Sequence, residues 1–270
     1  MLGGYWESVA IFVGINVLMG MSLYVPMAAG LISLGQGGFM AIGAYTSAVL
    51  TKQGWSFGIA LPAGAALAAV AGLIVGAPAL RIRGIYLMIL TLGFGEIVRV
   101  FFLNFEPTGG ATGLGGIAPL TQLPWVVIAC ALAVFVAWRL RASRLGRAMI
   151  AIHEDDVAAE AMGISLVTVK LFAFALGAGL AGIAGAFYAH QALYIDANQF
   201  DFSRSALTFL YVVLGGPANP FGPMVGAVVV TLLPEFLRVV ADWRMTFFGA
   251  LLVIAAIWRP DGLLRAPTFK

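Results

Sequence analysis

Two pairs of oppositely charged residues interrupt long apolar runs of the sequence. Glu96 and Arg99 lie three residues apart in one run, and Glu235 and Arg238 repeat that spacing in a later one. Residues three apart share one face of a helix, so each pair can neutralise itself or receive a zwitterionic solute. Ionisable groups at membrane depth are costly and commonly mark solute pathways. A polar gate for a zwitterion and a structural ion pair near the interface are both open interpretations.

The other reactive side chains do not form a catalytic or metal-binding set. Cys130 is the single cysteine and lies in an apolar run, and the two histidines, His153 and His190, are expected on opposite sides of a membrane. A P-loop holds phosphates with a Gly-Lys pair at a helix start, and the sequence has no Gly-Lys pair. We therefore predict that the chain is not an enzyme, holds no metal or other cofactor and hydrolyses no ATP itself.

Two glycine-rich stretches adjoin apolar segments that are too short to cross a membrane alone. The first is SLGQGGF at 33–39, and the second is LGGPANPFGP at 214–223. Paired interruptions of this kind point to a transport pathway, because non-helical backbone at membrane depth must be covered by protein or line a cavity. Close helix packing through small residues is the alternative. With the first charged pair, the predicted pathway residues are Ser33, Gln36, Gly37, Glu96, Arg99, Gly215 and Gly216.

The stretch RLGRAMIAIHEDDVAAEAMGI at 144–164 carries the signals of two short helices. Asp155 or Asp156 can cap the start of the second helix, and Gly163 can end it. The apolar stripe between these ends suits docking onto a partner protein, whereas the adjacent acids disfavour the alternative of a helix lying on lipid headgroups. The predicted coupling residues, within a coupling loop at 142–164, are Arg144, Arg147, Glu154, Asp155, Asp156, Val157, Ala158, Glu160, Ala161, Met162 and Gly163.

The composition around these features is that of a membrane protein. Of the 270 residues, 61% are hydrophobic and 10% are charged, against about 45–50% and about 25% in soluble domains. Helices of about 20 apolar residues span the hydrocarbon and satisfy their own backbone groups. We predict an all-α fold, a polytopic transmembrane helical bundle with broken helices and a cytoplasmic coupling helix, formed by a single domain over 1–270. The apolar segments are 9–31, 38–51, 57–80, 84–103, 123–141, 165–191, 204–216, 222–241 and 244–258.

Basic residues predict how these segments are oriented. By the positive-inside rule, loops rich in Lys and Arg face the cytoplasm, and the loop 104–122, which has neither, is external. The residues assigned to the cytoplasm are Arg81, Arg83, Arg139, Arg141, Arg144, Arg147, Arg259, Arg265 and Lys270. These loop residues, rather than nucleic-acid binding, explain the net charge of +3. Counting nine segments gives a cytoplasmic C-terminus and a periplasmic N-terminus in a bacterial inner membrane.

Several motifs in combination resemble one permease family. AEAMGI at 159–164 is similar to the loop by which permeases of ATP-binding-cassette (ABC) importers insert into their ATPases. Over nearly the full length, the chain resembles the LivM-type permeases of branched-chain amino acid importers, within the LivH/LivM family. The matching stretches are 31–45, 79–99, 108–117, 145–164, 212–227 and 258–264.

The resemblance implies a partner set and a substrate class. The partners would be a second permease of LivH type, two cytoplasmic ATPases of LivG/LivF type that bind ATP and Mg, and a soluble substrate-binding protein, all around a chain embedded in lipid. The substrate would be a branched-chain or related hydrophobic amino acid, although similar permeases handle urea and short amides. From the residues alone, an ion-coupled carrier with Glu96 as its buried carboxylate and a passive channel for a small polar solute are further alternatives.

Overall fold

The computed structural model describes residues 2–79, 82, 84–236, 249 and 262–264. The described part of the predicted segment 222–241 ends at Phe236, and of the segment 244–258 only residue 249 is described. The predicted charged residues that lie outside the described part are Arg81, Arg83, Arg238, Arg259, Arg265 and Lys270.

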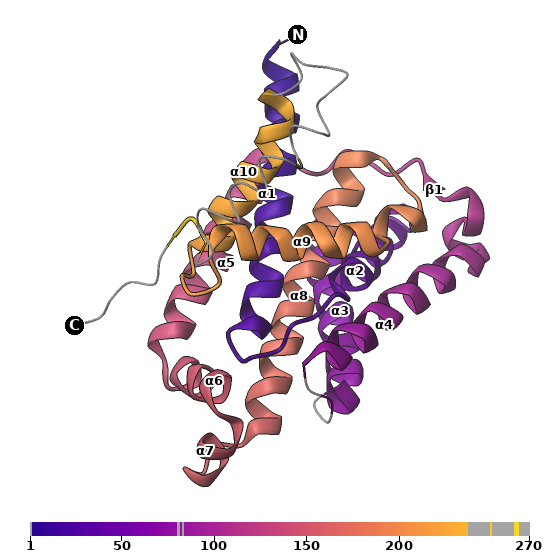
Figure 1. Ribbon diagram of the computed structural model, residues 1–270. Helices are drawn as coiled ribbons and strands as arrows, with labels where there is room; N and C mark the ends of the chain where they lie inside the picture. The colour runs from indigo at the N-terminus through magenta and orange to yellow at the C-terminus, as the bar shows by residue number, and fades with distance from the viewer. Residues whose placement is uncertain (1, 80–81, 83, 237–248, 250–261, 265–270) are drawn as a thin grey trace.

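Helices make up most of the described chain, as predicted for an all-α bundle (Figure 1). They are α1 (Leu2–Met27), α2 (Gln36–Lys52), α3 (Phe57–Ala79), α4 (Ile85–Asn104), α5 (Leu123–Ala142), α6 (Arg144–Glu154), α7 (Asp156–Ala161), α8 (Leu166–Ala192), α9 (Phe202–Gly215) and α10 (Gly222–Phe236). Three short 3-10 turns, η1 (Glu106–Thr108), η2 (Gly110–Thr112) and η3 (Ala197–Phe200), order the loops before α5 and α9. The strands β1 (Leu114–Gly115) and β2 (Tyr194–Ile195) join these two loops as an antiparallel pair.

Within the described residues, five helices are long and apolar enough to cross a membrane, so the chain is a multi-pass membrane protein. They are Gly4–Met27 of α1, Phe57–Ala79, Ile85–Asn104, Leu123–Ala142 and Leu166–Ala192. Helix α2 has 17 residues and α9 has 14. At about 1.5 Å per residue they measure about 26 and 21 Å, short of about 30 Å of hydrocarbon. As predicted, neither is long enough to cross alone, and α9 lies crosswise to the direction of α1 and α8 (Figure 1).

Helix α8 packs against α1, α2 and α3. Glycine lets its backbone approach α2 closely: a Cβ atom on Gly185 would lie 2.0 Å from the carbonyl oxygen of Met40, and one on Gly43 would lie 2.1 Å from that of Gly182. Membrane helices associate through such small residues, because lipid provides no hydrophobic drive between them. The α1 span is 67% buried and the α8 span 56%, against 22% for α3 and 17% for α5. The core therefore lies around α1, α2 and α8.

The two ends of the bundle differ in structure (Figure 1). Helices α6 and α7 protrude at one end, whereas β1 and the start of α1 lie at the other. The loops 104–122 and 142–164, which the charge pattern assigns to opposite membrane faces, thus lie at opposite ends of the bundle.

Candidate functional site

Helix α6 begins the coupling loop and is held against the end of α5. Ser143 caps it by accepting a hydrogen bond from the Gly146 backbone N–H at 3.1 Å. A Cβ atom on Gly146 would lie 2.0 Å from the carbonyl oxygen of Leu140, so this corner requires glycine. Arg144 and Arg147 are exposed, and the Arg147 guanidinium donates to the Ala142 carbonyl oxygen at 3.1 Å. The predicted first helix of the loop is confirmed.

Helix α7 begins and ends where the sequence predicts. The Asp155 carboxylate accepts hydrogen bonds from the backbone N–H groups of Val157 and Ala158, at 2.8 and 3.1 Å. At the other end Gly163 has φ +81°, and its N–H donates to the Glu160 carbonyl oxygen while that of Ile164 donates to Ala159. This pair of bonds is a Schellman closure, which satisfies the free carbonyl groups of a helix end. This six-residue helix is therefore fixed at both termini.

The predicted apolar stripe of α7 faces outward. Val157 is 68% exposed and Met162 is 83% exposed, and Ala158, Ala161 and the acidic Glu160 are exposed beside them. Glu154 and Asp155 extend this surface at the corner between α6 and α7. Only Ala159 of α7 is buried among its described residues. Exposed apolar side chains rimmed by charge are typical of protein interaction sites.

Asp156 does not cap α7 but pairs with Lys170 of α8. The Lys170 ammonium donates to both carboxylate oxygens of Asp156 at 2.9 Å, and Lys170 is 8% exposed. Sequence reasoning left the capping role open between the two acids and did not select Lys170. The sequence feature that indicates this pair is a single lysine in the first turns of an apolar span, because a buried charge there needs a partner.

The first break lies nearer the N-terminus than the glycine pattern indicates, at 28–35 rather than 33–39. Helix α1 ends at Met27, the chain turns at Gly30 with φ +77°, and α2 begins at Gln36 rather than at residue 38. Gly37 therefore lies inside α2, where a Cβ atom would lie 2.7 Å from the Phe200 carbonyl oxygen. The glycines at this helix start serve close packing, which is why they did not mark its boundary.

The polar side chains of this break are buried and bonded. Ser33 is 0% exposed and its hydroxyl accepts from the Gly35 N–H at 3.2 Å. Gln36 is 1% exposed, and its side-chain oxygen accepts from the Ser22 hydroxyl of α1 at 3.1 Å. Ser22 was not predicted as part of this site.

Two further hydroxyls, both missed at the sequence level, fix the start of α2 to other helices. The Thr91 hydroxyl of α4 accepts from the Leu34 N–H at 2.9 Å, and the Ser205 hydroxyl of α9 accepts from the Gly37 N–H at 2.9 Å. Both residues are buried. The backbone donors left free by the break are thus satisfied from α4 and α9, a long-range pairing that local patterns do not reveal.

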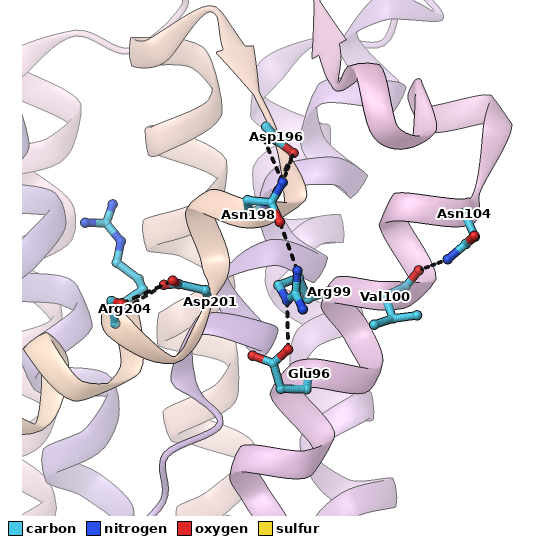
Figure 2. Close-up of polar contacts among 9 residues, drawn as sticks. Glu96, Arg99, Val100, Asn104, Asp196, Asn198, Asp201 and Arg204 are labelled. Atoms are coloured by element: carbon cyan, nitrogen blue, oxygen red, sulfur yellow. Dashed lines mark hydrogen bonds and ion pairs between the residues drawn. The ribbon is translucent and has the colours of Figure 1, made fainter.

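Glu96 and Arg99 form part of a polar cluster, defined here as Glu96, Arg99, Asp196 and Asn198. The Arg99 guanidinium lies between the Glu96 carboxylate, at 2.8 Å, and the Asn198 side-chain oxygen, at 2.9 Å (Figure 2). The Asn198 amide in turn donates to Asp196 at 3.2 Å. Arg99 therefore links α4 to the loop before α9. Of the second predicted pair, Glu235 accepts from the Tyr5 hydroxyl of α1.

Gly215 and Gly216 lie at the opposite end of α9 from the α2 start. A Cβ atom on Gly215 would lie 1.9 Å from the Gly222 carbonyl oxygen, and Gly216 has φ +105°. The Leu264 N–H donates to the Gly215 carbonyl oxygen at 3.0 Å. Ten residues of helix separate Gly215 from Ser205 by about 15 Å. The structure therefore places the predicted pathway residues in three places: the α2 start, the polar cluster and the α9–α10 turn.

The chain resembles known permease components of transport systems. The family described as the branched-chain amino acid transport system permease component matches residues 5–256. The high-affinity branched-chain amino acid transport system permease protein LivM of Escherichia coli (strain K12) is 37% identical over 93% of this chain, and LivM of Salmonella typhimurium gives the same values. The autoinducer 2 import system permease protein LsrC of Shigella flexneri is 27% identical over 93% of this chain and 77% of its own length.

The match to LivM is long but does not cover the whole relative. The chain spans 66% of the length of the two LivM proteins. No solved structure matches the chain significantly. Because the family match covers most of this sequence and the fold is the expected helical membrane bundle, the chain belongs to the branched-chain amino acid transport system permease family.

Proposed function

We propose that this chain is the membrane permease subunit of an ABC importer that carries branched-chain or related hydrophobic amino acids across the bacterial inner membrane. ATP would be bound and hydrolysed, with Mg, by separate ATPase subunits. A change of shape in those subunits would displace the coupling loop and tilt the spans between outward-open and inward-open states. That is alternating access driven through a mechanical joint.

The observation that carries this proposal is the surface of α7. A six-residue helix is closed at both ends, and it presents Val157 and Met162 to solvent with acidic Glu160 between them. An isolated turn of this length is not stable without capping and contacts. Its fixed termini and exposed apolar side chains fit a rigid knob that inserts into a cleft of a partner protein.

The proposed partners follow from the family and from this surface. Two ATPases of LivG/LivF type would receive α7 from this chain and from a second, LivH-type permease. A substrate-binding protein would meet the opposite end of the bundle, where β1 and β2 lie. The coupling loop and the C-terminus would then face the cytoplasm, and the start of α1 the periplasm, as the basic residues predict.

The amino-acid substrate is proposed from the names of the relatives and from the polar cluster. Its carboxylates and guanidinium form a charged rim where α4 meets the loop before α9. Such a rim suits a zwitterion better than an uncharged amide. The buried start of α2, with Ser33, Gln36 and Gly37, would be the next part of the pathway.

The experiment is co-purification of the cognate ATPases with the permease, followed by uptake of labelled leucine with the cognate binding protein in proteoliposomes. Glu160→Lys reverses a charge on the α7 surface, and Gly163→Val forces a branched side chain onto a left-handed backbone at the helix end. Both variants are expected to lose the ATPases and leucine uptake.

The matched control is Gly54→Val. Gly54 has φ +92°, and like Gly163 it has no atom within 4 Å of the position of a Cβ atom. It lies in the turn after α2, away from the coupling loop. Gly54→Val should strain the backbone to a similar degree and keep the ATPases bound. Equal retention of the ATPases by the wild-type, Glu160→Lys and Gly163→Val proteins would contradict the proposed function.

A further inference from the structure

The coupling loop is joined to α8 by an ion pair between Asp156 and Lys170. Both carboxylate oxygens of Asp156 lie 2.9 Å from the Lys170 ammonium, and the two side chains are 19% and 11% exposed. A charge-assisted contact with two acceptor atoms fixes direction as well as distance. Low exposure keeps solvent and salt from screening the pair, unlike pairs on open surfaces.

The ion pair joins the N-terminal end of α7 to α8. The C-terminal end of α7 is connected to α8 through the short turn from Met162 to Ser165. In that turn no atom lies within 4 Å of the position of a Cβ atom on Gly163, whereas the neighbouring Ile164 packs against the core. Asp156 is the first residue of α7, at the end away from that turn. The ion pair and the turn therefore hold the two ends of α7 on α8.

Helix α8 in turn is locked to the helix that begins at the first break. The Gly182 carbonyl oxygen lies against Gly43 of α2, and the Met40 carbonyl oxygen lies against Gly185 of α8, with no room for a Cβ atom at either glycine. Helices in backbone contact of this kind move together, because densely packed interiors transmit displacement. A continuous series of contacts thus leads from Asp156 through Lys170 and α8 to α2.

We infer that Lys170 is a positioning residue of the transport cycle, whose ion pair with Asp156 transmits the displacement of α7 to α8 and so to the start of α2. The inference rests on the proposed function. It separates two events that the proposed function combines: capture of the ATPase by the α7 surface, and transfer of the resulting movement into the bundle. Loss of the pair should leave capture intact and uncouple ATP hydrolysis from transport.

The test uses the complete complex of both permeases, the ATPases and the liganded binding protein in proteoliposomes. Removing one partner of a part-buried pair leaves the other charge without its counter-ion, so the informative variant removes both charges, as Lys170→Met with Asp156→Asn. The Asp156 carboxylate binds Lys170 of α8 and is not part of the exposed α7 surface, so we expect this paired variant to keep the ATPases and to hydrolyse ATP at close to the normal rate. The number of solute molecules transported per ATP hydrolysed should fall by about tenfold, within the usual range of coupling between sites.

A matched control breaks a polar contact at the same helix start that does not reach α7. The Ser165 and Thr168 hydroxyls share a hydrogen bond of 2.9 Å in the first turn of α8. Ser165→Ala with Thr168→Val should leave the ratio of transport to hydrolysis unchanged. An unchanged ratio in the Lys170/Asp156 paired variant, or an equal loss in this control, would overturn the inference.

A covalent replacement tests the same role in the opposite direction. In a Cys130→Ser background, Lys170→Cys with Asp156→Cys can be joined by a short bifunctional thiol reagent. The joined protein should regain transport per ATP relative to the unjoined protein, and no gain would overturn the inference. Failure of the wild-type chain to retain any ATPase would instead overturn the proposed function, and this inference with it.

Discussion

The turn after α7 and the interior of α2 use glycine in opposite surroundings. At Gly163 no atom lies within 4 Å of the position of a Cβ atom, whereas at Gly43 a carbonyl oxygen lies 2.1 Å away. The first glycine is needed only for its left-handed backbone, and the second only for the absence of a side chain. The α2–α8 contact is therefore fixed by backbone packing, while the α7 surface has apolar side chains that no described residue covers. Variants of one region that leave the other unchanged test whether one serves packing and the other serves docking.

The largest effect on stability is expected from Gly43→Ala. The new methyl group would meet the Gly182 backbone, which has no rotamer with which to move aside, and such overpacking costs about 3 kcal/mol. Gly93 of α4 is the matched control, since a Cβ atom there has open space. Gly93→Ala should be neutral or stabilising by about 0.5–1 kcal/mol, because alanine favours helix over glycine. Thermal unfolding in detergent measures the stability of both variants. Equal melting temperatures would show that the close contact at Gly43 does not stabilise the bundle.

Thr91→Val should have the next largest effect. The Thr91 hydroxyl is buried and is the acceptor for the part-buried Leu34 N–H, so its removal leaves that donor unpaired, at a cost of about 2 kcal/mol. Thr51→Val is the control, because the Thr51 hydroxyl bonds only to carbonyl groups of its own helix among the described residues. A melting temperature lowered equally by both changes would mean that Thr91 does not hold the break.

Asp155→Ala should act mainly on the coupling loop. Loss of a helix cap costs about 1 kcal/mol, which corresponds to roughly fivefold weaker binding if α7 must be formed to dock. Asp201 caps α9 in the same way, accepting from the Arg204 N–H. Asp201→Ala should lower the melting temperature without changing the affinity for the ATPases. The affinity is measured by titrating the ATPases onto immobilised permease. Equally weakened binding by both variants would contradict a specific role of the Asp155 cap in docking.

Met162→Ser should have the smallest effect on stability. Met162 is 83% exposed, and changes at such positions usually alter stability by less than about 0.5 kcal/mol. Binding of the ATPases should nevertheless weaken, because the apolar contact is lost. Trp55→Ser is the control, since Trp55 is 53% exposed at the turn after α2. If Met162→Ser bound the ATPases as tightly as the control does, the α7 surface would not be the docking site.

Local signals predicted the parts of this molecule that local forces determine. The long apolar runs, the short α2 and α9, a cap from Asp155 or Asp156 and the Gly163 helix end could all be predicted, because each depends on neighbours along the chain. The partners of Lys170, Thr91 and Ser205 come from segments 14 to 168 residues away. The same is true of the crosswise course of α9. Such contacts depend on how helices are arranged in space, which hydropathy and capping patterns do not encode.

The most direct test of the proposed docking is a crosslink from α7. Met162→Cys in the Cys130→Ser background places a single thiol at an exposed position of the helix. In membranes that contain the whole complex, a short thiol-directed photocrosslinker on this residue should attach to an ATPase subunit. The thiol should react with a membrane-impermeant reagent only from the cytoplasmic side. Labelling from the periplasmic side, or the absence of any ATPase adduct in an active complex, would contradict the coupling role of α7.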